Sequence, residues 1–331
     1  MENKKKYLMN EISVSTQTPD HFDYLILSFD EDEERSWKIL YELKTKSIVI
    51  DRLCVFVFGT TEKAVKGIIS SSEIDYNSLS CTEGEKQDYT TNVLSMVDKI
   101  DGIHKNSIVG VDITGMPTPQ YFLLINWLSG QVDSIFVYYT QPERYIMNNG
   151  LFESYFSTVG PISVAEIDGY SGIITNDEEG HRVLICMLGF DNDLLPVVIQ
   201  DAGPERIVAI NGFPSFFPKF KDVSLANNHK FLVGSEFSSR IEKTQLLSDY
   251  FYVEATNPFE TYNTLDEIAK EQKGYCIDIV PLGTKPMSLG ACLFAIFHKE
   301  VRVVFPIPEK YAKGISQRSR GTFEYVISFV F

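Results

Sequence analysis

Residues 273–311 read KGYCIDIVPLGTKPMSLGACLFAIFHKEVRVVFPIPEKY, and residues 107–145 read SIVGVDITGMPTPQYFLLINWLSGQVDSIFVYYTQPERY. At an offset of 166 residues and without gaps, Asp112 aligns with Asp278 and Thr118 with Thr284. The tetrapeptide Pro-Glu-Arg-Tyr at 142–145 aligns with Pro-Glu-Lys-Tyr at 308–311. Self-similarity over a fixed spacing is the mark of an internal repeat. We therefore predict that the two halves of the chain descend from one duplicated unit.

The similarity continues upstream in the same order. TTNVLSMVDKI at 90–100 resembles TYNTLDEIAKE at 261–271, and YLILSFDEDEE at 24–34 resembles VLICMLGFDND at 183–193. The matching segments occur in the same order in both halves, so chance matches of single segments do not explain the similarity well. We expect Asp112 to be equivalent to Asp278, and Tyr145 to be equivalent to Tyr311.

Each half alternates hydrophobic runs of strand length with helical segments. The expected strands are 24–29, 53–59, 108–113 and 134–139 in the first half, and 183–190, 206–212, 276–280 and 301–305 in the second. Long apolar helices are expected at 120–128 and 287–297. Near-continuous apolar strands that alternate with helices indicate a parallel sheet covered on both faces. The predicted fold class is α/β, a tandem pair of Rossmann-like lobes with mostly parallel sheets.

The predicted boundaries follow from these runs. We assign residues 1–20 to a tail, 21–149 to an N-terminal Rossmann-like lobe, 150–181 to a β-hairpin linker, and 182–331 to a C-terminal Rossmann-like lobe.

The composition and the net charge of the chain limit the classes of function that it can have. The chain has 331 residues, a net charge of −15 and a sequence pI of about 4.8. This acidity argues against general nucleic-acid binding, which requires clustered Lys and Arg. The five cysteines contain no CxxC pair, as is typical of reduced thiols in a cytoplasmic protein. We find no signal peptide and no apolar run long enough to cross a membrane, so we expect a cytoplasmic location and no membrane partner.

The segment Gly283-Thr284-Lys285 follows an expected strand and enters an apolar helix. Ligands of open α/β sheets bind beyond the carboxyl ends of the strands. Backbone N–H groups, the Thr284 hydroxyl, the Lys285 ammonium and the helix dipole can together hold an anion, with Ser288 nearby. The alternative is a plain turn with a solvated lysine and Pro286 starting the helix. The segment is not a Walker A loop, since GxxxxGK[ST] is absent.

The segment Asp278–Gly290 resembles the ligand loop of CARF domains, the CRISPR-associated Rossmann-fold sensors, and more loosely other Rossmannoid sensors of prokaryotic antiphage defence. CARF proteins bind cyclic oligoadenylates or related nucleotides with such loops, usually as symmetric dimers. The resemblance covers about 15 residues and the order of strands and helices. The corresponding loop of the first half, residues 114–120, keeps Thr118 but lacks the lysine, which puts a second equivalent site in doubt.

A second cluster, residues 255–263, follows another expected strand. Asn257 is a natural helix N-cap before Pro258, and Glu260 occupies the position of a capping-box acid. The functional interpretation is that Asn257, Glu260 and Tyr262 bind a ribose or a base edge beside the Gly-Thr-Lys loop. Gly189 and Asp191 are expected at the floor of the same pocket.

Other motifs leave alternatives open. The aromatics of residues 211–217 can stack on a base or pack against the neighbouring lobe, and the acidic run 30–34 is either a cation ligand or a solvated helix start. The repeated tetrapeptides at 142–145 and 308–311 are expected to form a turn with an ion pair and a tyrosine lid. The five histidines lack metal-ligand spacing, so no metal is expected.

The leading hypothesis is a nucleotide-binding or nucleotide-sensing protein, an accessory component of antiphage defence, with no further cofactor. Its partners would be a nucleotide or another small anionic ligand, and an effector protein or a second copy of the chain as a homodimer. One alternative is a nucleotide-processing enzyme of N-glycosidase or phosphodiesterase type, with Glu260 or Asp278 as the catalytic carboxylate. A purely structural interaction protein is the other.

Overall fold

The computed structural model describes residues 18–145, 158–172, 181–191, 194–232, 247–312 and 316–329. Most of the expected tail and much of the expected 150–181 linker lie outside these residues. The chain divides into two compact units. Unit 1 contains residues 1–145 and 316–331, and unit 2 contains residues 146–315. Each unit is an α/β sandwich built on a six-stranded, mostly parallel sheet.

The sheet of unit 1 has the strand order β12-β5-β4-β1-β2-β3. Its strands are β1 (His21–Asp30), β2 (Val49–Phe58), β3 (Tyr76–Glu83), β4 (Val109–Asp112), β5 (Ser134–Tyr145) and β12 (Ser316–Ser328). The helices are η1 (Glu34–Trp37), α1 (Lys38–Thr45), α2 (Glu62–Ser71), α3 (Tyr89–Val97) and α4 (Thr118–Gln131). The central strands are buried over most of their length, which explains their continuous apolar sequences.

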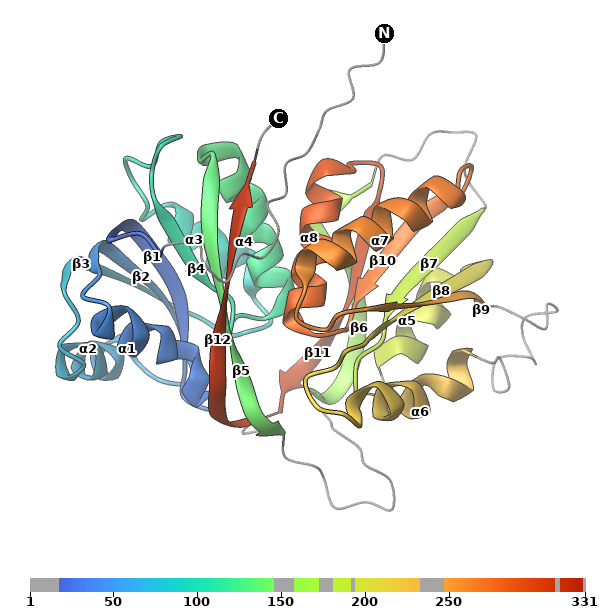
Figure 1. The fold of residues 1–331 in the computed structure, drawn as a ribbon, viewed down its shortest axis with the longest axis horizontal. Coiled ribbons are helices and arrows are strands. Elements are labelled where there is room, and N and C mark those ends of the chain that lie inside the picture. The colour runs from blue at the N-terminus through green and yellow to red at the C-terminus, as the bar shows by residue number, and fades with distance from the viewer. Residues whose placement is uncertain are drawn as a thin grey trace, which may run out of the picture. The chain divides into compact units, whose positions relative to one another are not determined.

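The sheet of unit 2 has the strand order β6-β11-β10-β7-β8-β9. Its strands are β6 (Thr158–Ser171), β7 (Arg182–Met187), β8 (Arg206–Gly212), β9 (Leu247–Val253), β10 (Cys276–Pro281) and β11 (Arg302–Tyr311). The helices are α5 (Leu194–Ala202), α6 (Phe220–Leu232), α7 (Pro258–Glu271) and α8 (Lys285–Phe297). Helices α7 and α8 pack together on one face of this sheet, and α5 and α6 lie on the other (Figure 1).

The two strand orders are the same once β1–β5 are matched with β7–β11 in sequence order. In both units the chain starts in the middle of the sheet, adds two strands on one side, and returns to the other side of the first strand. This identity of topology confirms the predicted fold class and supports the duplication. In both units an antiparallel strand completes the edge beside β5 or β11.

The edge strands are exchanged between the units. β6, which follows β5 in the chain, pairs with β11 of unit 2. β12, which follows β11, pairs with β5 of unit 1, where it is the red strand beside the green one in Figure 1. The sequence-based division placed residues 316–331 in the C-terminal lobe and 150–181 in a hairpin linker. In the structure, Ser316–Ser328 belongs to the sheet of unit 1, and Thr158–Ser171 forms one long strand rather than a hairpin.

The pairing of the strands shows that the expected equivalence of Asp112 and Asp278 is wrong. Asp112 lies level with Tyr138 of β5, but Asp278 lies level with Arg302 of β11, so the register differs by two residues from the ungapped offset. The structural counterpart of Asp278 is therefore Gly110. The expected equivalence of Tyr145 and Tyr311 agrees with the structure, because each pairs with the first residue of its antiparallel partner strand. The tetrapeptides at 142–145 and 308–311 lie within β5 and β11 and form no turn, contrary to expectation.

No described helix is both long and apolar enough to cross a membrane.

Candidate functional site

The loops that follow β8, β9 and β10 meet at the carboxyl edge of the sheet of unit 2. The Pro214 carbonyl accepts a hydrogen bond from the Ala255 N–H at 3.0 Å. The Ala255 carbonyl in turn accepts from the Thr284 hydroxyl. These bonds tie the three loops to the N-terminus of α8. Parallel strands deliver such loops to one edge, where ligands of open α/β sheets bind.

The loop after β7 joins the same edge at the point where the strand order reverses. A Cβ atom added to Gly189 would lie 2.3 Å from the carbonyl oxygen of Leu282, so only glycine fits here. The Gly189 carbonyl accepts hydrogen bonds from Ser224 at 3.1 Å and from Asn228 at 3.0 Å. Asp191, two residues further on, is buried. Gly189 is therefore a close-packing position beneath the loop after β10.

The N-terminus of α8 is capped and carries a basic residue. Thr284 is the N-cap, and its Oγ1 accepts from the N–H of Met287 at 3.4 Å. Lys285 occupies the first helical position and is half-buried, and the first turn contains no acidic residue. A cation at this end of a helix opposes the helix dipole, which favours anions there. The local charge is therefore suited to an anionic ligand.

Gly283 and Ser288 shape this turn from inside. A Cβ on Gly283 would lie 3.0–3.3 Å from atoms of Met287 and Met187. The Ser288 hydroxyl is buried and donates to the Pro281 carbonyl at 3.0 Å. Both residues make contacts that hold the loop in shape.

In the 255–263 cluster, Asn257 and Glu260 bond to the backbone of their own segment, as expected for residues with a structural role. Asn257 caps α7 by accepting from the N–H groups of Phe259 at 3.0 Å and Glu260 at 3.1 Å. The Glu260 carboxylate accepts from the N–H of Glu254 at 2.8 Å, three residues before the position that a capping box would use. Asn257, at the end of the loop after β9, and Glu260, in the first turn of α7, thus hold the shape of this loop.

Two predicted residues lie away from this edge. Tyr262 is buried and packs edge-to-face on Phe294, with ring centroids 5.8 Å apart, so it joins α7 to α8. Asp278 is fully buried near the amino end of β10, where it pairs with Arg182 at 2.8 Å and Arg302 at 2.6 Å. The Asp278 carboxylate therefore lies at the opposite edge of the sheet from the loop of residues 282–284.

The aromatics after β8 differ in their exposure to solvent. Phe216 is buried, whereas Phe213 is 49% exposed. Phe213 packs edge-to-face on Tyr252 of β9, itself 51% exposed, with ring centroids 5.9 Å apart. The Lys221 ammonium lies 5.9 Å from the Phe213 ring centroid. An exposed pair of rings at a carboxyl edge is a surface on which a base can stack.

At the corresponding edge of unit 1, acidic side chains form ion pairs with basic side chains of the same unit. Asp30, at the end of β1, is buried and forms an ion pair with Lys86. Glu33 pairs with the buried Arg35, whose Nη1 donates to the Thr140 carbonyl at 2.6 Å. The sequence left the run 30–34 as a cation ligand or a solvated helix start, but Asp30 and Glu33 are instead bound to internal cations.

The loop after β4 in unit 1 also differs from its counterpart. Thr118 occupies the first position of α4, as Lys285 does in α8, so this loop has no lysine at the start of its helix. A Cβ on Gly115 would lie 2.4 Å from the Ser28 hydroxyl and 2.5 Å from Ser36, so this loop packs tightly on β1 and η1. The single lysine-bearing loop of unit 2 is thus the stronger candidate for an anion.

The buried cysteines Cys54 and Cys292 do not present reactive thiolates. Burial raises the pKa of the Cys54 thiol to about 12 and that of Cys292 to about 12. Thiol nucleophiles require a lowered pKa, which partial exposure and nearby cations supply.

No family model matches the sequence, and no curated protein matches it. Among solved structures, the chain is similar to a type III CRISPR defence DNA nuclease activated by cyclic oligoadenylate, with 9% sequence identity and a TM-score of 0.51. The similarity covers 85% of this chain and 65% of the nuclease chain, so it spans about two thirds of the nuclease. The cytoplasmic domain of a prokaryotic cation chloride cotransporter also matches, with 7% identity and a TM-score of 0.27, over 89% of this chain and 98% of that one. At 9% identity the likeness to the nuclease is one of fold alone.

Proposed function

We propose that unit 2 binds a nucleotide at the carboxyl edge of its sheet and that the chain is a nucleotide sensor of antiphage defence. The observation that carries this proposal is the hydrogen-bonded meeting of the loops after β8, β9 and β10 at the N-terminus of α8. That helix starts with Lys285 and has no acid in its first turn. A phosphate fits such a terminus, because backbone N–H groups, the helix dipole and the ammonium all favour an anion.

The proposed ligand contacts divide by chemistry. Lys285 and the Gly283-Thr284 backbone would bind phosphate, Phe213 with Tyr252 would stack a base, and Gly189 would floor the pocket. Asn257, Glu260 and Ser288 would hold the loops in shape. The fold likeness to a nuclease activated by cyclic oligoadenylate suggests which nucleotides to test first.

This geometry supports a nucleotide-processing enzyme less well than a nucleotide-binding protein. The Glu260 carboxylate is bonded to the backbone of its own loop, and Asp278 is neutralised by two arginines. A general acid or base must reach the bond that it acts on. We therefore propose binding, with the output passed to an effector protein or a second copy of the chain.

A thermal-shift screen with product analysis tests the proposal. The panel contains cyclic oligoadenylates, cyclic dinucleotides, mononucleotides and NAD, and each mixture is also analysed by chromatography. A specific ligand at 100 times its dissociation constant adds about 2.7 kcal/mol to stability and raises the Tm. We expect one cyclic nucleotide class to raise the Tm and to be recovered intact. Recovery of a cleaved product would favour the enzyme, and a panel without any shift would contradict the sensor.

A further inference from the structure

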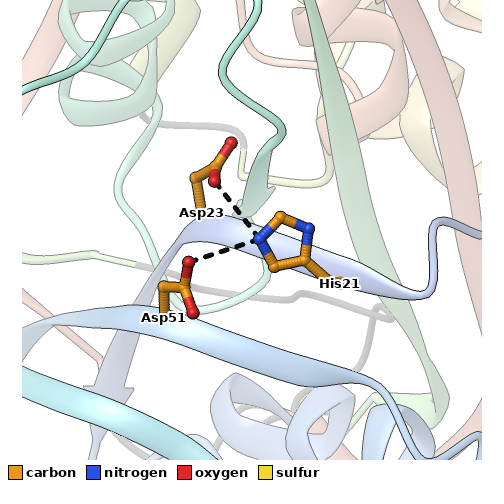
Figure 2. A group of neighbouring side chains, drawn as sticks. All are labelled: His21, Asp23 and Asp51. Atoms are coloured by element: carbon orange, nitrogen blue, oxygen red, sulfur yellow. Dashed lines mark hydrogen bonds and ion pairs between the residues drawn. The ribbon is translucent and has the colours of Figure 1, made fainter.

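Three side chains of unit 1 converge at the amino edge of its sheet, the edge opposite the carboxyl ends of the strands. His21 and Asp23 are two residues apart on β1, so they project from the same face. Asp51 lies on β2, level with Asp23, because Phe22 is opposite Ile50 and Tyr24 is opposite Arg52. Figure 2 shows the two carboxylates directed at one nitrogen of the imidazole ring.

The distances are those of a ligand set around one ion. Nε2 of His21 lies 3.2 Å from a carboxylate oxygen of Asp23 and 3.3 Å from one of Asp51. The three ligand atoms all lie within 4.8 Å of one another. Ligands about 2.0–2.1 Å from a tetrahedral zinc ion are about 3.3–3.4 Å apart, and the two distances from His21 to the aspartates are close to this value.

Bonds from outside the cluster orient both carboxylates. The second oxygen of Asp51 accepts from the Asn77 amide at 2.8 Å, and the second oxygen of Asp23 accepts from the N–H of Ile108 at 2.6 Å. Each aspartate therefore has one oxygen held by the protein and one directed at His21. Outer contacts of this kind fix metal ligands in place.

A histidine–carboxylate ion pair explains the arrangement less well. Nε2 carries at most one proton, and two carboxylates face that one nitrogen. At His298, by contrast, Glu300 faces Nδ1 and Asp266 faces Nε2, so each ring nitrogen has its own acid. Among the described residues, only the His21 cluster brings three such ligand atoms together.

Unit 2 provides an internal comparison at the same sheet position. Arg182 of β7 lies level with Glu205, as Asp23 lies level with Asp51, since Val183 is opposite Arg206. His181 pairs with Glu205 at 3.1 Å, but the place of the second carboxylate is taken by the Arg182 guanidinium, which binds Asp278. Among the described residues of unit 2, no second carboxylate lies at this position.

We propose that His21, Asp23 and Asp51 form a binding site for a divalent first-row transition metal, with zinc as the representative ion. Imidazole nitrogen with carboxylate oxygen is a donor set that suits zinc and its neighbours better than magnesium, which prefers oxygen alone. The three side chains are 31–42% exposed, so the ion has an open route from solvent and room for water ligands. The spacing of the histidines in the sequence gave no sign of this site, because the third ligand comes from a neighbouring strand.

Isothermal titration of the full chain with zinc chloride tests the site, in reducing buffer and on a Cys276→Ser background that removes a half-buried thiol. We expect one zinc ion per chain and much weaker binding of magnesium. His21→Gln and Asp51→Asn should each abolish the zinc heat at micromolar concentrations. His181→Gln is the matched control, since it removes a histidine that faces a single acid, and it should bind zinc like the parent.

Asn77→Ala is a milder variant that leaves all three ligands in place. Because Asn77 only orients Asp51, we expect its loss to weaken zinc binding by roughly 10–100-fold. Circular dichroism checks that each variant is folded. Absence of zinc binding in the parent would overturn the proposal, as would unchanged binding in folded His21→Gln, or an equal loss in His181→Gln. Nucleotide binding by unit 2 is measured separately and should be the same in all these variants.

Discussion

Arg302 and Asp278 face each other at the amino ends of β11 and β10, where Nε and Nη2 of the arginine donate to the two oxygens of the carboxylate at 2.8 Å and 2.6 Å. Arg182 donates to the same carboxylate from β7. The hydrogen bond to Asp278 raises the pKa of Arg302 above its ordinary value despite its burial. Three adjacent strands are thus joined by one buried acid.

This arrangement makes Asp278 a stabilising residue. Asp278→Asn leaves two guanidinium groups with no full negative charge between them. Breaking a buried pair costs about 3–5 kcal/mol, and we expect about 3 kcal/mol here because both arginines still contact water. Urea denaturation should show the loss, and nucleotide affinity of the folded variant should be unchanged. If the variant instead turned over a nucleotide more slowly without losing stability, a catalytic role for Asp278 would be supported.

Lys285→Ala is expected to weaken nucleotide binding. A charge-assisted contact to phosphate contributes about 1.5–3 kcal/mol, which corresponds to a loss of roughly 10–150-fold in affinity. The stability should change by no more than about 1 kcal/mol, because Lys285 is only half-buried. Lys273→Ala, at an exposed position before β10 and so at the opposite edge, is the control for net charge. Titration calorimetry with the ligand found in the screen measures both, and equal losses would mean a non-specific charge effect.

Phe213→Leu removes an aromatic face and keeps an apolar side chain of similar size. Stacking of a base on an aromatic ring contributes about 1–3 kcal/mol, so the affinity for the nucleotide should fall by that amount. Inorganic phosphate should bind as before, since it has no base. An unchanged nucleotide affinity would show that the Phe213–Tyr252 pair does not contact the ligand.

Gly290→Ala tests the packing of α8 on α7. The added Cβ would lie 2.3 Å from the Pro258 carbonyl oxygen and 2.7 Å from Cβ of Thr261. Because the first of these atoms is backbone, the helices must separate, and we expect a loss of about 1–3 kcal/mol. The control is Gly67→Ala in α2, where nothing lies within 4 Å of the new atom and the variant should gain about 0.5–1 kcal/mol. Thermal denaturation of both variants distinguishes steric conflict from helix propensity.

Glu33 should make unit 1 sensitive to acid. Burial alone would raise the pKa of Glu33, but the hydrogen bonds and charge of Arg35 outweigh it and hold the pKa below its ordinary value. A group with a lowered pKa stabilises the fold above its unfolded pKa, and that stability is lost as the pH falls through the folded pKa. At pH 7, Glu33→Gln should be less stable by about 1.5–3 kcal/mol. The urea midpoints of the parent and of Glu33→Gln should approach each other as the pH falls from 7 to 3. A difference that stays constant with pH would contradict a stabilising role for the ionised Glu33 carboxylate.

Much of the fold could be predicted from the sequence because it depends on local patterns. The apolar runs at 24–29 and 276–280 are long enough for strands and are bounded by polar residues, so both strands were recognised. The cap of α7 is predictable for the same reason, since Asn257 bonds to N–H groups two and three residues away. The Gly-Thr-Lys turn was likewise found at the carboxyl end of a strand.

The tertiary structure decided what depends on pairing between distant strands. A strand such as Ser316–Ser328 offers the same backbone donors and acceptors to any open sheet edge, so its sequence does not say that it joins β5 rather than β11. Asp278 is bound by Arg302 rather than exposed to a ligand because the register of β10 and β11 places them level. The meeting of His21 with Asp51 has the same origin, because two strands 30 residues apart lie side by side. Local sequence determines which segments become strands, whereas register and strand order determine which side chains share an edge.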